Sequence, residues 1–217
     1  MSNINNFLSS FKTDMARPCN YTVELHPSAE FFGVLKRLET TEGALQNIFR
    51  QVDSLSEVKT ISEFRCEQAE LPARAFALVD QKTYGPIEQF PIQNSYNRLP
   101  LVFMCSDDMR EKLFFDLWME TICPSHPSIN YNLLDSGGGA IRFDFEYKSN
   151  YRSDVIIRQR GLDGIPTYSI ALRDAFPVEV YSMPLSWRVT DDYHRLNVVF
   201  AYRYFYTLTT TSGGETT

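Results

Sequence analysis

A helical repeat of apolar residues follows Ser106-Asp107-Asp108 near the middle of the chain. Apolar residues recur there at spacings of three and four, while charged residues such as Glu111 fill much of the remaining surface. Ser106 can accept hydrogen bonds from free amides, and the aspartates lie where the helix dipole is positive. These signals predict a helix over residues 106–122 that ends before Pro124. The side chains predicted to pack on one face are Met109, Leu113, Phe114, Leu117 and Trp118.

Patterns typical of β-strands precede this helix. Residues 19–25 alternate in side-chain character, and residues 98–105 are rich in β-forming side chains. Residues 64–72 also alternate and stop at Pro72, which cannot donate a hydrogen bond to a ladder. We therefore expect three strands in the first half of the chain.

The second half of the chain predicts more strands than helices. The candidate strands are residues 141–147, 154–160, 167–172, 176–181 and 196–206. In the last of them, every second residue from Leu196 to Tyr206 is apolar or aromatic, over a length unusual for a strand. The patterns together predict a mainly β protein with one flanking helix.

Residues 79–97 predict a long loop between two of these strands. Gly85-Pro86, Pro91 and Asn94 are spread among polar residues, so the segment can be neither a continuous central strand nor a helix. A long ordered loop in a compact domain usually has a binding role. We therefore treat this segment as a candidate contact surface.

Residues 26–60 interrupt the run of strands and are interpreted as an insertion, with a helix from residue 41 to about 52. The segment has too many apolar side chains for a solvated loop, among them Phe31, Phe32, Leu45, Ile48 and Phe49. We expect them to cover a surface of another chain; the alternative is a flap that folds back on its own protomer. The remaining chain divides into an arm over residues 1–16, a single domain that extends to residue 208, and a disordered tail over 209–217.

Composition narrows the function. The chain has 217 residues, 43% of them hydrophobic, which suits one sizeable soluble domain. A net charge of −6 argues against a protein that grips nucleic acid electrostatically. No stretch reaches the length of a membrane span, and the first 16 residues lack the pattern of a signal peptide, so we expect a cytosol-like setting. The four scattered cysteines predict buried thiols rather than zinc ligands or disulfides.

Candidate chemical sites are few. His26, His126 and His194 have no partner at motif spacing, and residues 137–139 lack the lysine of a phosphate loop. The pair Asp107-Asp108 already has a structural reason to exist at a helix start. We therefore expect no enzyme activity, and no catalytic, cofactor-binding or metal-binding residues.

Several motifs in one order resemble the tail tube protein family of contractile-tailed phages. The motifs span most of the chain, and each is weak alone. They are Ala16-Arg17-Pro18, Cys66-Glu67-Gln68-Ala69-Glu70-Leu71-Pro72, Tyr84-Gly85-Pro86-Ile87-Glu88-Gln89-Phe90-Pro91, Leu101-Val102-Phe103-Met104-Cys105-Ser106-Asp107-Asp108-Met109-Arg110, Pro184-Leu185-Ser186-Trp187 and Val199-Phe200-Ala201-Tyr202-Arg203-Tyr204.

The resemblance implies a β-barrel or sandwich protomer, a homo-hexameric ring, and rings that stack into a tube. It implies also a lumen through which DNA and the tape measure protein pass during genome ejection, without specific DNA binding, and an outer surface for the sheath protein. The location implied is the virion tail, assembled in the host bacterial cytoplasm. The acidic balance suits such a conduit, because like charge in the wall eases the transit of DNA.

Two alternatives share this fold. The first is a tube initiator at the baseplate, because such proteins resemble tube subunits but bear insertions, and residues 26–60 are interpreted as one. The second is the inner tube subunit of a phage-derived contractile injection or secretion system. In each case, baseplate or tube-terminator proteins are expected partners. Within the loop, the residues expected to contact the neighbouring ring are Tyr84, Gly85, Pro86, Ile87, Glu88, Phe90 and Pro91.

Overall fold

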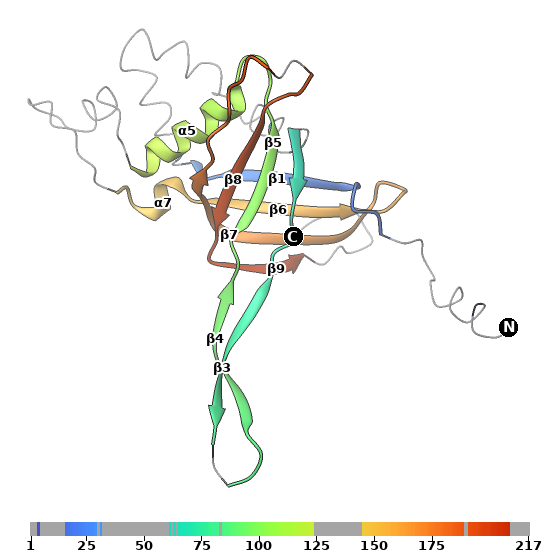
Figure 1. Cartoon of the computed structure of the whole chain (residues 1–217), viewed down its shortest axis with the longest axis vertical. Coiled ribbons are helices and arrows are strands. Elements are labelled where there is room, and N and C mark those ends of the chain that lie inside the picture. The colour runs from blue at the N-terminus through green and yellow to red at the C-terminus, as the bar shows by residue number, and fades with distance from the viewer. Residues whose placement is uncertain are drawn as a thin grey trace, which may run out of the picture.

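A seven-stranded antiparallel sheet forms the body of the protein in the computed structural model, which describes residues 4, 16–29, 31, 61, 63, 65–82, 84–123, 145–188 and 191–208. The strand order is β1-β6-β7-β8-β5-β2, and β9 pairs with β7 off this path (Figure 1). The strands are β1 (Tyr21–Pro27), β2 (Cys66–Ala69), β5 (Leu99–Met104), β6 (Ser153–Arg160), β7 (Pro166–Val180), β8 (Arg195–Ala201) and β9 (Tyr204–Leu208). The prediction of a mainly β fold is confirmed.

Strand β7 belongs to both halves of this sheet. Its first part pairs with β6 and β9, and its last part pairs with β8. Between them, Asp174 has a left-handed backbone (φ 54°), and the register with β6 shifts by one residue. In Figure 1, β1, β6, β7 and β9 run across the view while β5 and β8 run steeply to them. The expectation of separate strands over 167–172 and 176–181 is wrong, because a bulge at Asp174 bends one strand without ending it.

The long last strand is likewise two strands. β8 ends at Ala201 and β9 begins at Tyr204, because the chain follows the bend of β7 and pairs with a different part of it on each side. The amide of Arg203 donates to the carbonyl of Arg173 at 3.0 Å, which ties the break to the bulge. Tyr202 then packs near Tyr96, whereas Tyr204 packs against Tyr206, so the predicted single face is not kept.

The two end strands of the sheet approach each other. The hydroxyl of Tyr21 on β1 donates to the carbonyl of Cys66 on β2 at 3.1 Å. Burial raises the pKa of Tyr21 to about 12, so this phenol remains a donor at any physiological pH. The sheet thus curls toward a barrel, one of the two forms that the family resemblance implies.

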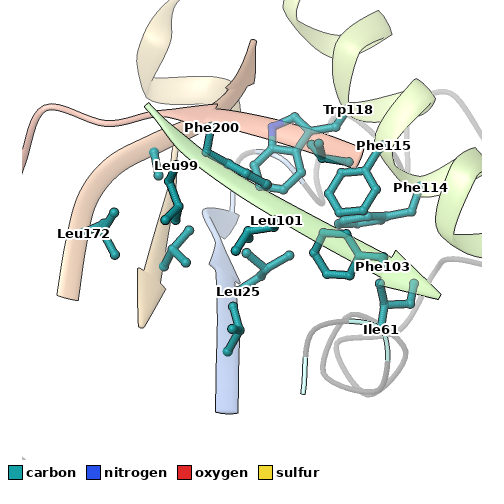
Figure 2. Close-up of a cluster of buried hydrophobic side chains, with 14 of the residues drawn as sticks. Leu25, Ile61, Leu99, Leu101, Phe103, Phe114, Phe115, Trp118, Leu172 and Phe200 are labelled. Atoms are coloured by element: carbon teal, nitrogen blue, oxygen red, sulfur yellow. The ribbon is translucent and has the colours of Figure 1, made fainter. Parts of the chain in front are cut away.

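Helix α5 (Arg110–Ile122) covers this barrel with an aromatic face (Figure 2). Phe114, Phe115 and Trp118 are fully buried, and Phe115 lies between Phe103 of β5 and Phe200 of β8, with ring centroids 4.9 and 6.1 Å away. Of the residues predicted for the packed face, Phe114, Leu117 and Trp118 are buried, while Met109 and Leu113 are only half-buried. Phe115 was not predicted, because a face wider than one stripe is buried here.

The helix begins at Arg110, later than predicted. Residue Met109 is the N-cap, in a left-handed conformation (φ 53°) and without a side-chain capping bond. Ser106 instead closes a turn, because its backbone carbonyl accepts from the amide of Met109 at 3.0 Å. Its hydroxyl donates to the carboxylate of Glu111. The expected serine cap is therefore wrong, because this hydroxyl is used on a buried acid.

Glu111 was expected on the surface and is completely buried. Its carboxylate forms an ion pair with Arg65 and accepts from the amide of Ser106 at 2.9 Å. A buried carboxylate is tolerated when an opposite charge and hydrogen-bond donors surround it. This acid joins the start of α5 to the chain that leads into β2.

One predicted strand is absent where it can be seen. Of residues 141–147, the structure describes 145–147, which form no strand and leave Phe145 and Tyr147 79% and 80% exposed. The amide of Glu146 donates to the carbonyl of Ile122 at 2.9 Å, so this segment closes the end of α5 before the short helix α7 (Lys148–Tyr151). An apolar–polar alternation does not by itself make a strand, because a strand also needs a neighbouring strand to pair with. Residues 141–144 lie outside the described residues, as do the expected helix from 41 to about 52 and the tail 209–217.

A comparison of substitutions at the two tryptophans of the chain tests this packing. Trp118 is fully buried and its indole donates to the carbonyl of Tyr151 at 2.8 Å, whereas Trp187 is fully exposed. We expect Trp118→Ala to lower the free energy of unfolding by about 3–5 kcal/mol, from lost contacts and the cavity that remains. The matched change Trp187→Ala should cost less than about 0.5 kcal/mol. Denaturant melts measure both, and similar losses at the two positions would contradict the packing described.

Candidate assembly surfaces

A two-stranded β-hairpin projects from the body and is the most prominent surface feature (Figure 1). It consists of β3 (Arg74–Gln81) and β4 (Glu88–Tyr96), which pair with each other and, within the described residues, with no other strand. The expectation of a loop over residues 79–97 is wrong. Pro91 lies opposite Leu78, where the register shifts after Ala77. A proline is tolerated because both strands of an isolated ribbon are edges.

The hairpin exposes apolar side chains along its whole length. Tyr84 at the tip is fully exposed beside Gly85, whose φ of 120° suits glycine. Contiguous apolar surface of this kind usually marks an interaction site. Every residue of the predicted contact loop lies here and is exposed, namely Tyr84, Gly85, Pro86, Ile87, Glu88, Phe90 and Pro91. Sequence reasoning missed the exposed residues nearer the base, which are Phe76, Leu78, Val79 and Ile92.

A signal for the hairpin was present in the chain. Two β-rich runs, residues 74–81 and 88–96, flank Gly85-Pro86, which is a turn sequence. The base of the ribbon is anchored by Tyr96, whose ring lies 5.9 Å from Tyr202 and 5.5 Å from Phe205. The ribbon is therefore held at one end and free at the other.

A second apolar surface lies on the segment between β7 and β8. Trp187 and Leu185 are 103% and 85% exposed, and with Pro184 and Tyr193 they line a hollow of the surface. We call these four residues the Trp187 surface. Sequence reasoning quoted Pro184 to Trp187 as a family-like motif but assigned no contact to it.

Polar contacts anchor one side of the Trp187 surface to the sheet. The guanidinium of Arg195 lies 4.3 Å from the ring centre of Tyr193 and forms ion pairs with Glu67 and Asp192. The carbonyl of His194 accepts from the amide of Cys105 at 2.9 Å. The exposed aromatic groups therefore project from a supported edge of the sheet.

The third surface is the outward face of β1, β6, β7 and β9, which carries a network of charges. Arg158 approaches both carboxylate oxygens of Glu24, at 2.9 and 3.0 Å, and His26 lies 3.3 Å from the same carboxylate. Arg173 pairs with Asp154 and donates to the hydroxyl of Tyr206 at 2.7 Å. The hydrogen bond from His26, with the one from Arg158, lowers the pKa of Glu24 to about 2. This face is hydrophilic and suits contact with water or a polar cargo.

Of the predicted contact residues of the insertion, the structure describes only Phe31. Phe31 is fully buried in the protomer's own core, with its ring 5.1 Å from Trp118 and 6.1 Å from Phe114. Its amide donates to the hydroxyl of Ser28 at 3.3 Å. An intersubunit role for Phe31 is therefore wrong, because α5 already covers it. Phe32, Leu45, Ile48 and Phe49 lie outside the described residues.

Features that would indicate chemistry are few in the described part of the chain. No cluster of three His, Cys, Asp or Glu side chains is placed there to hold a metal ion. No helix there has the length and apolar character to cross a bilayer. All four cysteines are free; Cys66, Cys105 and Cys123 are half-buried, and burial raises the pKa of the Cys66 thiol to about 12. Cys19 is exposed, which corrects the expectation that all four thiols are buried.

Comparison with known proteins gives one family and one fold. The family model for phage tail tube protein matches residues 16–208. No curated protein matches the chain.

Solved structures of similar fold include chains of tube and baseplate assemblies. A chain of the anti-feeding prophage baseplate has a TM-score of 0.55 at 10% identity, covering 90% of this chain and 97% of its own. A chain from the sheath/tube terminator of the extracellular contractile injection system PVC has a TM-score of 0.53 at 8% identity, covering 91% and 99%. A chain of the anti-feeding prophage tube-terminating cap has a TM-score of 0.52 at 10% identity, covering 91% and 93%. At these identities the likeness is one of fold.

The charge network predicts a pH dependence of stability. The folded pKa of Glu24 is depressed from an ordinary value of 4.5 to about 2, so its stabilisation is present above pH 4.5 and is lost as the pH falls toward 2. Glu24→Gln should lower the free energy of unfolding at neutral pH by on the order of 1 kcal/mol, allowing for solvent screening. The difference from wild type should vanish near pH 2. Melts across this range measure it, with Glu88→Gln on the exposed hairpin as control; a difference independent of pH would contradict the electrostatic origin.

Proposed function

The chain belongs to the phage tail tube protein family and has a structural role in a tail tube, and on that premise we propose that it forms hexameric rings that stack inside a contractile sheath. The single observation that carries the proposal is the projecting hairpin. It exposes apolar residues from Phe76 to Ile92 that a solitary soluble protein would not leave uncovered. A ring placed on top of another would cover them.

Free strand edges support closure of the ring. Within the described residues, β1 pairs with β6 alone, β2 with β5 alone and β9 with β7 alone, so each presents a row of unpaired backbone groups. Such edges pair readily with another chain unless they are covered. Closing a ring through them satisfies these groups without any new secondary structure.

The proposed tube is a conduit and not an enzyme. A net charge of −6 suits a wall along which DNA slides without being held, and the tape measure protein would occupy the same lumen before ejection. Sheath protein on the outside, and baseplate and terminator proteins at the ends, are the further partners we propose. The assembled site is the virion tail, built in the host bacterial cytoplasm.

Shortening the hairpin tests the stacking role. Because Ala77 pairs with Gln93, residues 78–92 can be replaced by Asn-Gly, which closes a two-residue hairpin turn at that point. We expect folded rings that no longer form tubes, because the body of the sheet does not depend on the distal ribbon. Sedimentation velocity and negative-stain electron microscopy measure this. Tubes of normal length from the shortened protein would refute the role.

The insertion, which begins after β1 because His26 and Pro27 still pair with β6, favours a second candidate, an initiator at the baseplate end of the tube. Phe31 is needed in the core, so the test replaces residues 33–59 with a short Gly-Ser linker. If the insertion binds a baseplate protein, tubes should grow normally but fail to attach to baseplates in a particle assembly assay. Normal growth together with normal attachment would show that the insertion is a private flap.

A further inference from the structure

We propose that the Trp187 surface is the receptor for the tip of the β3–β4 hairpin of a second copy of this chain in the adjacent ring. This inference rests on the proposed stacking of rings and names the surface that receives the hairpin. The tip comprises residues 84–90, and the Trp187 surface comprises Pro184, Leu185, Trp187 and Tyr193.

Strand register places the two surfaces at opposite ends of the body. The hairpin leads directly into the start of β5, where Leu99 pairs with Phe200. The segment that carries Trp187 leads into the start of β8, where Arg195 pairs with Met104 at the end of β5. In Figure 1 the hairpin points to the bottom and the connection into β8 lies at the top. Copies stacked along this axis would bring the tip of one toward the Trp187 surface of the next.

The two surfaces match in chemistry. Trp187 and Tyr84 are both fully exposed, and Leu185 and Ile87 beside them are 85% and 61% exposed. Exposed aromatic residues that become buried at the centre of an interface are the usual anchors of binding energy. The hollow at Trp187 is open to solvent, so a protruding aromatic tip can enter it.

Charges next to the apolar groups are also complementary. Lys82 precedes the tip and Glu88 lies within it, and Arg188 and Asp191 follow Trp187 in the sequence. Each sign on the hairpin therefore has an opposite sign available on the receptor. Such pairs at a rim add orientation more than affinity.

The symmetry of the contact suits a tube. The tip and the receptor are different surfaces of the same chain, so their contact is heterologous and leaves one of each free at the ends of any stack. A heterologous contact along an axis does not close on itself and can propagate. An isologous contact, between the Trp187 surfaces of two copies, would instead end assembly at pairs of rings.

The experiment uses two single substitutions in the full chain, Tyr84→Ser and Trp187→Ser. Both residues are exposed, so the body should stay folded. Each variant alone should form rings but raise the threshold concentration for tubes at least about tenfold, as loss of an interface anchor does. Tyr147→Ser, which removes an exposed aromatic residue at neither surface, is the matched control and should form tubes like wild type.

Mixing the two variants gives the deciding result. Rings of the Trp187→Ser variant still have an intact hairpin, and rings of Tyr84→Ser still have an intact receptor. The mixture should therefore form stacks of two rings and no longer tubes, as seen by electron microscopy and sedimentation, while the double variant forms single rings only.

The other outcomes overturn the inference in distinguishable ways. If Tyr84→Ser stops stacking but Trp187→Ser forms normal tubes, hairpin stacking stands and the receptor lies elsewhere. If Trp187→Ser gives monomers, the Trp187 surface belongs to the contact within a ring; if its tubes form but do not bind sheath, it belongs to the outer wall. If both variants form normal tubes, the stacking role of the hairpin fails as well.

Discussion

Strand β7 bends at Asp174, and because it pairs with β6 and β9 before the bend and with β8 after it, this one strand holds both halves of the sheet. The bulge lets hydrogen bonding continue while the strand direction changes. β8 and β9 are separated at Arg203 for the same reason, and Phe103 and Phe200 of the sheet pack against Phe115 of α5. Without that bend the sheet would remain open and its apolar face exposed.

The aromatic residues that stabilise the protomer are different from the aromatic residues that are exposed for assembly. The aromatic cluster of α5 with Phe31, Phe103 and Phe200 fills the core, and the buried pair of Glu111 and Arg65 joins the helix start to the chain before β2. The hairpin and the Trp187 surface carry aromatic residues that contribute little to the folded protomer because solvent surrounds them. This separation lets contact surfaces change without loss of the fold, which suits a protein whose function is to assemble.

The sequence by itself determined the elements whose pattern follows from local chemistry. The alternation at residues 19–25 corresponds to β1, the β-forming composition of residues 98–105 corresponds to β5, and the helical repeat that contains Phe114 and Trp118 corresponds to α5. In each case one face must be apolar and the backbone period sets the spacing. The ordered motifs also led to the family that the comparisons show.

Tertiary structure alone decided which strands, charged groups and aromatic side chains find a partner in the folded protein. Residues 167–181 became one strand because a bulge at Asp174 bends β7 without ending it, and Glu111 became buried because Arg65 and Ser106 meet it from other parts of the chain. Pro91 did not prevent a strand, because the ribbon that contains it has no further neighbour. Whether an aromatic residue is core or contact was decided in the same way: Trp118 and Trp187 belong to one residue type, and only the packing around each makes the first buried and leaves the second exposed.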